Sequence, residues 1–423
     1  MSSDWIETSL SDLADINPRR PILKGKKAPF IDMAALPAYS REISGKIVHR
    51  EFRGSGSKFQ NGDTLLARIT PCLENGKTAL VNCLEDDSFG HGSTEFIVLG
   101  PKSLKDTEFL YYLARCEDFR SFAIARMEGT SGRQRVPNSA VGKYVFMCPN
   151  SEKRAEIGKL LSSIDDCIKA LRETNATLEA MAQAIFKSWF VDFDPVHAKM
   201  EGRVPDGMDA ATAALFPDSF EESELGLIPK GWHVSNIGKA FILTMGQSPP
   251  GDTYNESGAG LPFYQGRTDF GIRFPTQRMF CTAPNRIAEA GDTLVSVRAP
   301  VGDVNMAIEK CCLGRGVAGI RHPLGFGSFV FYSAQALRIR FKVFDTEGTV
   351  FGSINKKDFQ ELPVVEPDIA IYKAFNNFSS IINDQVVENE KEIRTLATLR
   401  DTLLPRLISG QLRIPESPNE LQT

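Results

Sequence analysis

The stretch Gly62-Asp63-Thr64-Leu65-Leu66 returns later in the chain as Gly291-Asp292-Thr293-Leu294-Val295. Nine residues after its glycine each copy has a proline, Pro71 or Pro300. Other residues recur in the same order, namely Trp5 as Trp232, Glu128-Gly129-Thr130 as Glu347-Gly348-Thr349, and Pro149 as Pro367. A unit that occurs twice in one chain forms a pseudo-dimer. Two similar but non-identical units suit a target with two different halves.

The composition is that of a globular protein with room for two or three domains, since 42% of the 423 residues are hydrophobic and 24% are charged. No apolar run has the length of a membrane span and residues 1–5 do not form a signal peptide, so we expect a cytoplasmic protein without a membrane segment. The eight cysteines form no C-x-x-C pair, which predicts neither a metal site nor a disulfide framework.

The net charge of -4 hides an uneven distribution. Residues 1–150 and residues 232–367 each contain two more basic than acidic residues, and the acidic excess lies in the remaining segments. This is a weak signal for nucleic-acid binding, because a strong DNA footprint is usually more basic. If the units bind DNA, partner proteins must neutralise many of the phosphates.

Both copies predict an α+β fold. Short strand-like runs separated by Gly, Pro and Asn fill residues 1–150 and 232–367, and residues 106–126 have a helical pattern. We therefore predict two pseudo-symmetric α+β units separated by a long antiparallel two-helix coiled coil.

A long helix follows each unit. Apolar residues recur there at alternating spacings of four and three, the pattern of a coiled-coil seam. The first seam is Ile157, Leu161, Ile164, Ile168, Leu171, Asn175, Leu178, Ala182, Ile185 and Trp189. The second is Phe375, Ile382, Val386, Asn389, Ile393, Leu396, Leu403 and Leu407, with Ser379 and Arg400 as weak positions. Pro405 is expected to kink or end the second helix near Leu404.

Each seam contains one asparagine. If the helices run antiparallel with Asn175 facing Asn389, the neighbouring layers are apolar, and pairing the two amides removes most of the cost of burying them. Those layers are Leu171 with Ile393, Ile168 with Leu396, and Leu178 with Val386. In the alternative arrangement each asparagine faces solvent or a partner.

These patterns divide the chain into the following predicted segments: a first recognition unit (1–150), a first helix (151–191), a tethering linker (192–231), a second recognition unit (232–367), a second helix (368–412) and a tail (413–423). Thirty helical residues span about 50 Å, which suits readers placed over half-sites of DNA about 34–36 Å apart. The same geometry would suit a scaffold for two protein partners.

Several of these stretches resemble the specificity subunit of Type I restriction–modification systems. They are residues 291–302 (GDTLVSVRAPVG), 62–71 (GDTLLARITP), 186–195 (FKSWFVDFDP), 403–412 (LLPRLISGQL) and 226–232 (GLIPKGW). The resemblance implies a non-catalytic subunit for host defence and DNA methylation, whose two target recognition domains read a bipartite double-stranded DNA sequence. It implies docking of two methyltransferase subunits and, through them, of restriction/translocase subunits. S-adenosylmethionine, ATP and Mg would be bound by those partners, and this chain would hold no cofactor.

The sequence also lacks the common catalytic motifs. Ser248-Pro249-Pro250-Gly251 has neither the asparagine nor the aromatic residue of an adenine methyltransferase motif, and no G-x-x-x-x-G-K loop is present. No acidic residue lies two positions before a lysine, as restriction nucleases require. We therefore expect no catalytic and no metal-binding residues. The alternative function is a scaffold that joins two proteins without reading DNA.

In the first unit, the best candidates for reading bases are Arg133, Gln134 and Arg135, because they offer guanidinium and amide groups on a loop that begins at Gly132. A solvated basic turn is the alternative. Arg19 and Arg20 are candidates for phosphate contacts. Four further candidates flank the turn after Gly62, namely Arg68, Thr70, Asn75 and Lys77. His91 is more typical of a structural histidine.

In the second unit, Gln265 and Arg267 are the best candidates, in a polar loop beside Tyr264. The remaining candidates are Gln247, Arg298, Arg315, Ser353, Asn355 and Lys356. Arg298 has an alternative role in an ion pair with Asp303 or Asp292.

Overall fold

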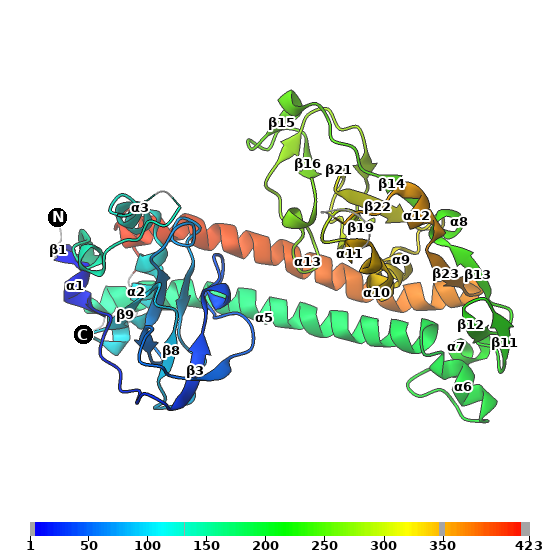
Figure 1. Ribbon diagram of the computed structural model, residues 1–423, viewed down its shortest axis with the longest axis horizontal. Coiled ribbons are helices and arrows are strands. Elements are labelled where there is room, and N and C mark those ends of the chain that lie inside the picture. The colour runs from blue at the N-terminus through cyan, green and yellow to red at the C-terminus, as the bar shows by residue number, and fades with distance from the viewer. Residues whose placement is uncertain (1–4, 131, 347–351, 416–423) are drawn as a thin grey trace. The chain divides into compact units, whose positions relative to one another are not determined.

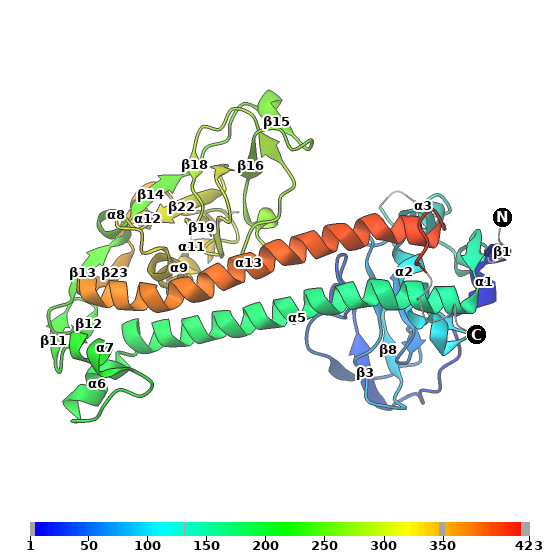
Figure 2. The ribbon, with the colours of Figure 1, turned by 180° about the vertical axis from the view of Figure 1, so that it is seen from behind.

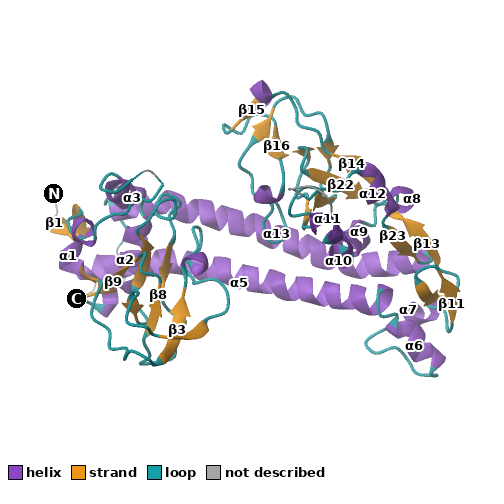
Figure 3. Ribbon diagram, in the orientation of Figure 1, coloured by secondary structure: helices purple, strands orange, loops and turns teal. Residues whose placement is uncertain are grey.

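A computed structural model describes residues 5–130, 132–346 and 352–415 (Figure 1). Its contacts divide the chain into two units, one made of residues 1–173 and 390–423 and the other of residues 174–389. Each unit mixes helices and strands (Figure 3), so the predicted α+β class is confirmed. Of the recurring sequence pairs, Glu347-Gly348-Thr349 lies outside the described residues.

The first unit contains two four-stranded sheets. In the sheet that carries the repeated motif the strand order is β2-β9-β6-β7, and all pairs are antiparallel. In the other sheet β8 pairs with β3 in parallel and with β5 antiparallel, and β4 lies beside β3. The strands are β2 (Ala14–Ile16), β3 (Lys27–Ile31), β4 (Val48–Glu51), β5 (Lys58–Phe59), β6 (Thr64–Ala67), β7 (Thr78–Leu80), β8 (Gly90–Gly92) and β9 (Phe96–Pro101).

Helices pack on the β6 sheet and close the core of the first unit. Leu66 of β6 and Ile97 of β9 lie in one buried cluster with Phe109 and Leu113 of helix α2. The strands β1 and β10 pair antiparallel just before the first long helix. These elements are β1 (Trp5–Ser9), α1 (Leu10–Leu13), η1 (Met33–Ala35), η2 (Leu104–Asp106), α2 (Thr107–Arg115), α3 (Glu117–Ile124), α4 (Asn138–Val141) and β10 (Val145–Pro149).

The second unit, seen from behind in Figure 2, repeats the strand order of the main sheet, but its other sheet has five strands in the order β15-β17-β16-β21-β18. Its main sheet has the order β14-β22-β19-β20, β16 and β21 are parallel, and β13 pairs with β23 before the second long helix. The strands are β13 (His233–Asn236), β14 (Ile242–Met245), β15 (Tyr254–Asn255), β16 (Leu261–Tyr264), β17 (Phe280–Cys281), β18 (Ile287–Ala288), β19 (Thr293–Ser296), β20 (Val304–Met306), β21 (Cys311–Leu313), β22 (Val317–Arg321) and β23 (Pro363–Glu366). The helices are α8 (Ile237–Ala240), η3 (Gly251–Thr253), η4 (Arg267–Asp269), α9 (Gly327–Ala336), α10 (Arg338–Phe341), α11 (Val343–Thr346) and α12 (Lys356–Glu361).

The repeated Gly-Asp-Thr motif builds the same turn in both units. Gly62 and Gly291 have φ angles of 89° and 84°, a region that glycine enters without steric cost. The next residue accepts a backbone N–H from three residues before it, Gln60 to Asp63 at 2.9 Å and Glu289 to Asp292 at 2.8 Å. The motif therefore recurs because it fixes the turn that begins the central strand.

Each buried aspartate of the motif pairs with an arginine, which comes from the loop after β2 in the first unit and from β22 in the second. Asp63 accepts Nη2 of Arg20 at 2.6 Å, whereas Asp292 accepts Nε of Arg321 at 2.6 Å. The residue that matches Arg321 in the first unit is Gly100, where an added Cβ would lie 3.1 Å from Arg20 Nη2. The same charge is thus balanced by two different chain segments.

The long helices α5 (Ser151–Phe190) and α13 (Ile369–Ile408) contribute to both units. In the first unit Ile164 and Ile168 pack with Ile393. In the second unit Nδ2 of Asn389 donates to Oδ1 of Asn175 at 2.7 Å, and Asn175 Nδ2 lies 3.5 Å from Val386 O. The structure therefore has the amide pair that defines the antiparallel register. The expected end of the second helix near Leu404 is not observed, because α13 continues through Pro405 to Ile408.

One seam position of the first unit carries a buried ion pair. Nη1 of Arg400 donates to Oδ1 of Asp165 at 2.5 Å, and each side chain is only 4% exposed. Tyr112 donates to the second oxygen of Asp165 at 2.6 Å. Burial alone would lower the pKa of Arg400, but the adjacent Asp165 charge reverses this and the net pKa is raised. The sequence pattern marked Arg400 only as a weak seam position.

The segment between the first long helix and the second unit is folded, where the sequence predicted a tether. It forms α6 (Asp194–Met200), α7 (Ala210–Leu215) and a hairpin of β11 (Phe220–Ser223) with β12 (Gly226–Pro229). Val196, Phe216 and Ile228 from this segment are buried in the core of the second unit. Residues 194–229 are therefore part of that unit.

The pair of Asn175 and Asn389 should make the free energy of unfolding lower than it would be with an apolar residue at both positions. Replacing both Asn175 and Asn389 by leucine should raise the free energy of unfolding by about 1–3 kcal/mol, because two buried amides are replaced by apolar groups. The single variant Asn389→Leu should be less stable than the double variant, because it leaves the Asn175 amide without its partner. Urea denaturation of the full chain measures both. A double variant less stable than either single variant would contradict this account.

The buried ion pair should make the protein unstable when only one of its two partners is removed. Asp165→Leu should lower the free energy of unfolding by up to about 3–5 kcal/mol, because it removes the buried counter-charge of Arg400 and leaves the guanidinium only the more exposed Asp401 as a partner. The double variant Asp165→Leu/Arg400→Met should recover most of this loss. Equal stability of the single variant and the unchanged protein would refute the role given to the pair.

Candidate functional site

Polar loops meet at one edge of the first unit, which we call the first edge. It consists of residues 17–21, 56–58, 68–70, 93–95 and 133–138. Backbone hydrogen bonds join these loops: Arg68 N donates to Glu95 O at 3.0 Å, Val136 N to Arg68 O at 2.9 Å, and Thr70 N to Gln134 O at 3.0 Å. The Thr70 hydroxyl also accepts the N–H of Gln134 at 3.1 Å. Loops far apart in the sequence are thereby held together.

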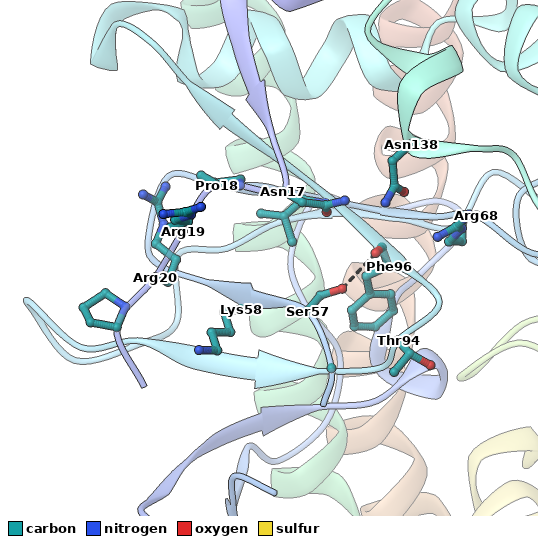
Figure 4. A pocket seen from close by; sticks show the side chains of 13 residues that line it. Asn17, Pro18, Arg19, Arg20, Ser57, Lys58, Arg68, Thr94, Phe96 and Asn138 are labelled. Atoms are coloured by element: carbon teal, nitrogen blue, oxygen red, sulfur yellow. Dashed lines mark hydrogen bonds between the residues drawn. The ribbon is translucent and has the colours of Figure 1, made fainter. Parts of the chain in front are cut away.

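A cavity of about 680 Å³ opens at the first edge (Figure 4). Within the described residues, Nε of Arg68 and Oδ1 of Asn138 are buried without a hydrogen-bond partner. The remaining lining includes Arg19 and Lys58, so cationic groups and unsatisfied polar atoms share one hollow. The cavity is lined by Asn17, Pro18, Arg19, Arg20, Pro21, Gly56, Ser57, Lys58, Arg68, Thr94, Phe96, Val98 and Asn138.

The sequence missed several residues of this cavity. Lys58 and Asn138 have the side-chain chemistry of a base or phosphate contact, but they come from segments far from each other and from Asn17, which lies in the predicted phosphate-contact stretch 17–20. Asn17 accepts Val98 N at 2.9 Å, which places it beside β9. Only the pairing of these segments in the fold brings them together.

Two of the predicted arginines of the first unit are held by carboxylates. Arg20 forms an ion pair with the buried Asp63, so this arginine has a structural role in the fold. Arg135 binds Glu95 through Nε and Nη2 at 2.7–3.0 Å. That hydrogen bond raises the pKa of the Arg135 guanidinium. Arg19 and Arg133 are exposed.

Two other candidates of the first unit lie away from this edge. Asn75 lines a separate cavity of about 420 Å³ together with Arg115 and Arg120. Nζ of Lys77 donates to the carbonyl of Met33 at 2.9 Å. His91 is 4% exposed and lies between the rings of Phe30 and Phe52, which agrees with a structural histidine.

Equivalent loops meet in the second unit, forming a second edge of residues 246–250, 264–266, 297–299, 314–316 and 352–356. Gln247 N donates to Leu313 O at 2.9 Å, and Gly316 N donates to Gln265 O at 3.0 Å. These bonds bring together three predicted residues, Gln247, Gln265 and Arg315, all of which are exposed. Nε of Arg315 donates to the hydroxyl of Ser248 at 3.1 Å.

Glycines permit the close approach of these loops. A Cβ on Gly246 would lie 2.2 Å from the carbonyl oxygen of Gly314, and a Cβ on Gly316 would lie 2.4 Å from that of Gln265. No side chain fits at such distances. Glycine is therefore required beside Gln247 and Arg315, because the backbones of the loops approach each other closely there.

Arg298 and Ser353 form a backbone bridge at the second edge. Asp292 and Asp303, the carboxylates considered for Arg298, bind other arginines, Arg321 and Arg338. Asn355 caps helix α12 by accepting Asp358 N at 3.0 Å, which gives it a structural role. Lys356, at the first turn of α12, is exposed.

Arg267 lies apart from Gln265. Its guanidinium binds the carboxylate of Asp303, to which Arg338 also binds. These three residues line a cavity of about 490 Å³ that also includes Gln183 and Gln335. Of the two best sequence candidates of the second unit, Arg267 therefore lines this cavity, whereas Gln265 lies on the exposed second edge.

The two edges occupy matching positions in the repeated fold. Val136 N bonds to Arg68 O in the first unit, as Ile354 N bonds to Val297 O in the second. Thr94 and Arg315 follow matching strands, β8 and β21. The units thus present the same framework with different side chains.

No group of three His, Cys, Asp or Glu residues that could hold a metal ion occurs within residues 5–130, 132–346 and 352–415. In that same part of the chain no helix combines the length and apolar character needed to cross a membrane. All eight cysteines are free thiols.

Comparison with known proteins gives a consistent result. Residues 2–180 match the model of the Type I restriction modification DNA specificity domain. A Type I restriction enzyme specificity subunit of Haemophilus influenzae is 24% identical, over 97% of this chain and 100% of that protein. A specificity subunit assigned to a type I restriction enzyme of Methanocaldococcus jannaschii is 28% identical, over 84% of this chain and 79% of that protein.

A solved structure has the same fold. The crystal structure of a Type I restriction–modification system S subunit from M. genitalium is 16% identical and covers 96% of each chain with a TM-score of 0.53.

Proposed function

Since the chain belongs to the family of Type I restriction–modification specificity subunits, we propose that its two units each bind one half of a two-part DNA sequence. The observation that carries this proposal is the presence of two matching edges with different side chains. A common framework places polar loops at the same position in each unit, while the residues on those loops differ. Such a pair of readers suits a target whose halves differ in sequence.

Exposed cations at each edge support contacts with phosphates. The first edge has Arg19 and Arg133, and the second has Arg298, Arg315 and Lys356. Their number is modest, in keeping with the small basic excess of each unit. A DNA-binding protein with few cations gains little affinity for arbitrary sequences, so its binding depends more on base contacts.

Amide side chains at the edges suit the reading of bases. Gln134 and Asn138 at the first edge, and Gln247 and Gln265 at the second, can each form paired hydrogen bonds with adenine. Arg68 and Arg315 can form paired hydrogen bonds with guanine. The fold brings these residues together at each edge, and hydrogen bonding to base edges is the role that we propose for them.

The relatives are named specificity subunits, and we propose that this chain is likewise a specificity component without catalysis of its own. We propose that two methyltransferase subunits dock on it and that restriction/translocase subunits join through them in the cytoplasm. Those partners would bind S-adenosylmethionine, ATP and Mg. The seam of α5 and α13, which contributes to both units, supports a role for these helices in holding such partners.

Exchanging one unit tests the bipartite reading. A chain whose residues 232–367 come from a related specificity subunit should keep one half of its target and acquire a new second half, because each unit reads independently. Mapping of methylated adenines in cells that express the complete system measures the target directly. A change in both halves, or in neither, would exclude separate readers.

Single substitutions test the second edge. Gln265→Ala and Arg315→Ala should each relax the preference at one base pair of the second half, with a loss of about 1–3 kcal/mol in discrimination. Lys356→Ala should weaken binding to all sequences about equally, because a phosphate contact carries no base information. Binding of the assembled complex to duplexes altered at single positions gives these values. Lys239→Ala, an exposed lysine in α8, is the control.

A further inference from the structure

One acidic side chain lies on the first edge itself. Glu95 holds Arg135 with Nε 3.0 and 2.9 Å from its two carboxylate oxygens, and with Nη2 2.7 Å from Oε1. The Glu95 carbonyl accepts Arg68 N at 3.0 Å, and the preceding residue, Thr94, lines the cavity. A carboxylate at this position repels the phosphates of DNA. Its presence at a DNA-binding edge therefore suggests a role in binding as well as in folding.

The ion pair contributes little to folding, because both partners are in contact with solvent. The side chains of Arg135 and Glu95 are 41% and 24% exposed, and ion pairs of this kind add little net stability. Its effect on the arginine is more specific. An arginine that is free to swing binds any nearby phosphate, whereas an arginine held on one side keeps one direction.

The contacts leave a defined part of the guanidinium available. Of its five N–H groups, Glu95 takes the one on Nε and one on Nη2. The carbonyl of Arg133 takes one on Nη1 at 3.1 Å. One N–H therefore remains on each terminal nitrogen. Nη1 and Nη2 are the two nitrogens through which an arginine can donate paired hydrogen bonds to O6 and N7 of guanine in the major groove.

We propose that Glu95 is a positioning residue that fixes Arg135 to read a guanine in the first half of the target and withholds it from phosphates. This rests on the proposed DNA-reading function of the first unit. The second unit lacks the arrangement, because the positions that match Glu95 and Arg135 are Gly316 and Ser353. Its Arg315 bonds to the neutral hydroxyl of Ser248 instead.

A carboxylate that only repelled DNA would weaken binding to the target and to other sequences by the same factor. A carboxylate that only stabilised the fold would strengthen binding to both by the same factor. A positioning residue acts differently on the two kinds of DNA. Its loss lowers affinity for the target, because the arginine no longer has a fixed direction, and raises affinity for other sequences, because the arginine reaches phosphates.

The test measures affinity of the full chain, assembled with the methyltransferase subunit of its own system, for the mapped target and for a random duplex. Glu95→Gln should bind the target about three- to tenfold more weakly and the random duplex a few-fold more tightly, with a salt slope steeper by about 0.9. Replacing one guanine of the first half by 7-deazaguanine, which lacks the N7 acceptor, should weaken the unchanged protein and have little effect on Arg135→Ala.

Glu85→Gln removes an equal charge from an exposed turn after β7 and is the matched control. The proposal is overturned if Glu95→Gln shifts both affinities in the same direction, or if it matches Glu85→Gln. If the unchanged protein does not distinguish its target from the random duplex, the proposed function itself fails.

Discussion

The pairing of α5 with α13 is the constraint on which the rest of the structure depends. The core of the first unit includes Ile157 and Leu161 from the beginning of α5, and Leu404 and Leu407 from the end of α13. The core of the second unit includes Phe186 and Phe190 from α5 together with Phe375 and Ile382 from α13. The second unit is one continuous stretch, residues 174–389, whereas the first unit combines residues 1–173 with residues 390–423. The register of the two helices therefore also determines which side chains close each core.

The seam carries different residues at positions that match between the two repeated units. In the first unit a tyrosine, Tyr112, donates to the buried Asp165, which also binds Arg400. In the second unit the matching tyrosine, Tyr332, packs its ring 5.9 Å from that of Phe186. The seam serine there, Ser379, is fully buried. In the first unit the ion pair joins the two seam helices, whereas in the second unit Tyr332 lies 3.5 Å from Glu179 of α5, whose partner Arg273 comes from outside the seam. The duplicated segments are consequently no longer interchangeable.

The sequence predicted the features that depend on local spacing, and missed those that depend on the meeting of distant segments. The seam asparagines and the α+β class follow from periodicity within one helix or one unit, and a turn that needs glycine leaves a visible motif at Gly62. By contrast, Asn17, Lys58 and Asn138 share a cavity only because three loops converge. Arg20 resembled a phosphate contact in sequence, since nothing nearby shows that Asp63 is buried beside it. Asp165 lies one residue away from the seam positions, so spacing alone gave no sign of an ion pair with Arg400.

The discontinuous make-up of the first unit has a consequence for biosynthesis. Residues 390–408 are synthesised after the whole of the second unit, yet they supply Leu404 and Leu407 to a core most of whose other members are synthesised before that unit. The nascent first unit must keep that apolar surface uncovered while the second unit is translated, which takes tens of seconds at about 5–20 residues per second. The synthesis of α13 closes both cores within the same short interval. A product that stops before residue 390 would carry an unfinished core in its first unit, so the folding of that unit depends on the synthesis of the whole second unit.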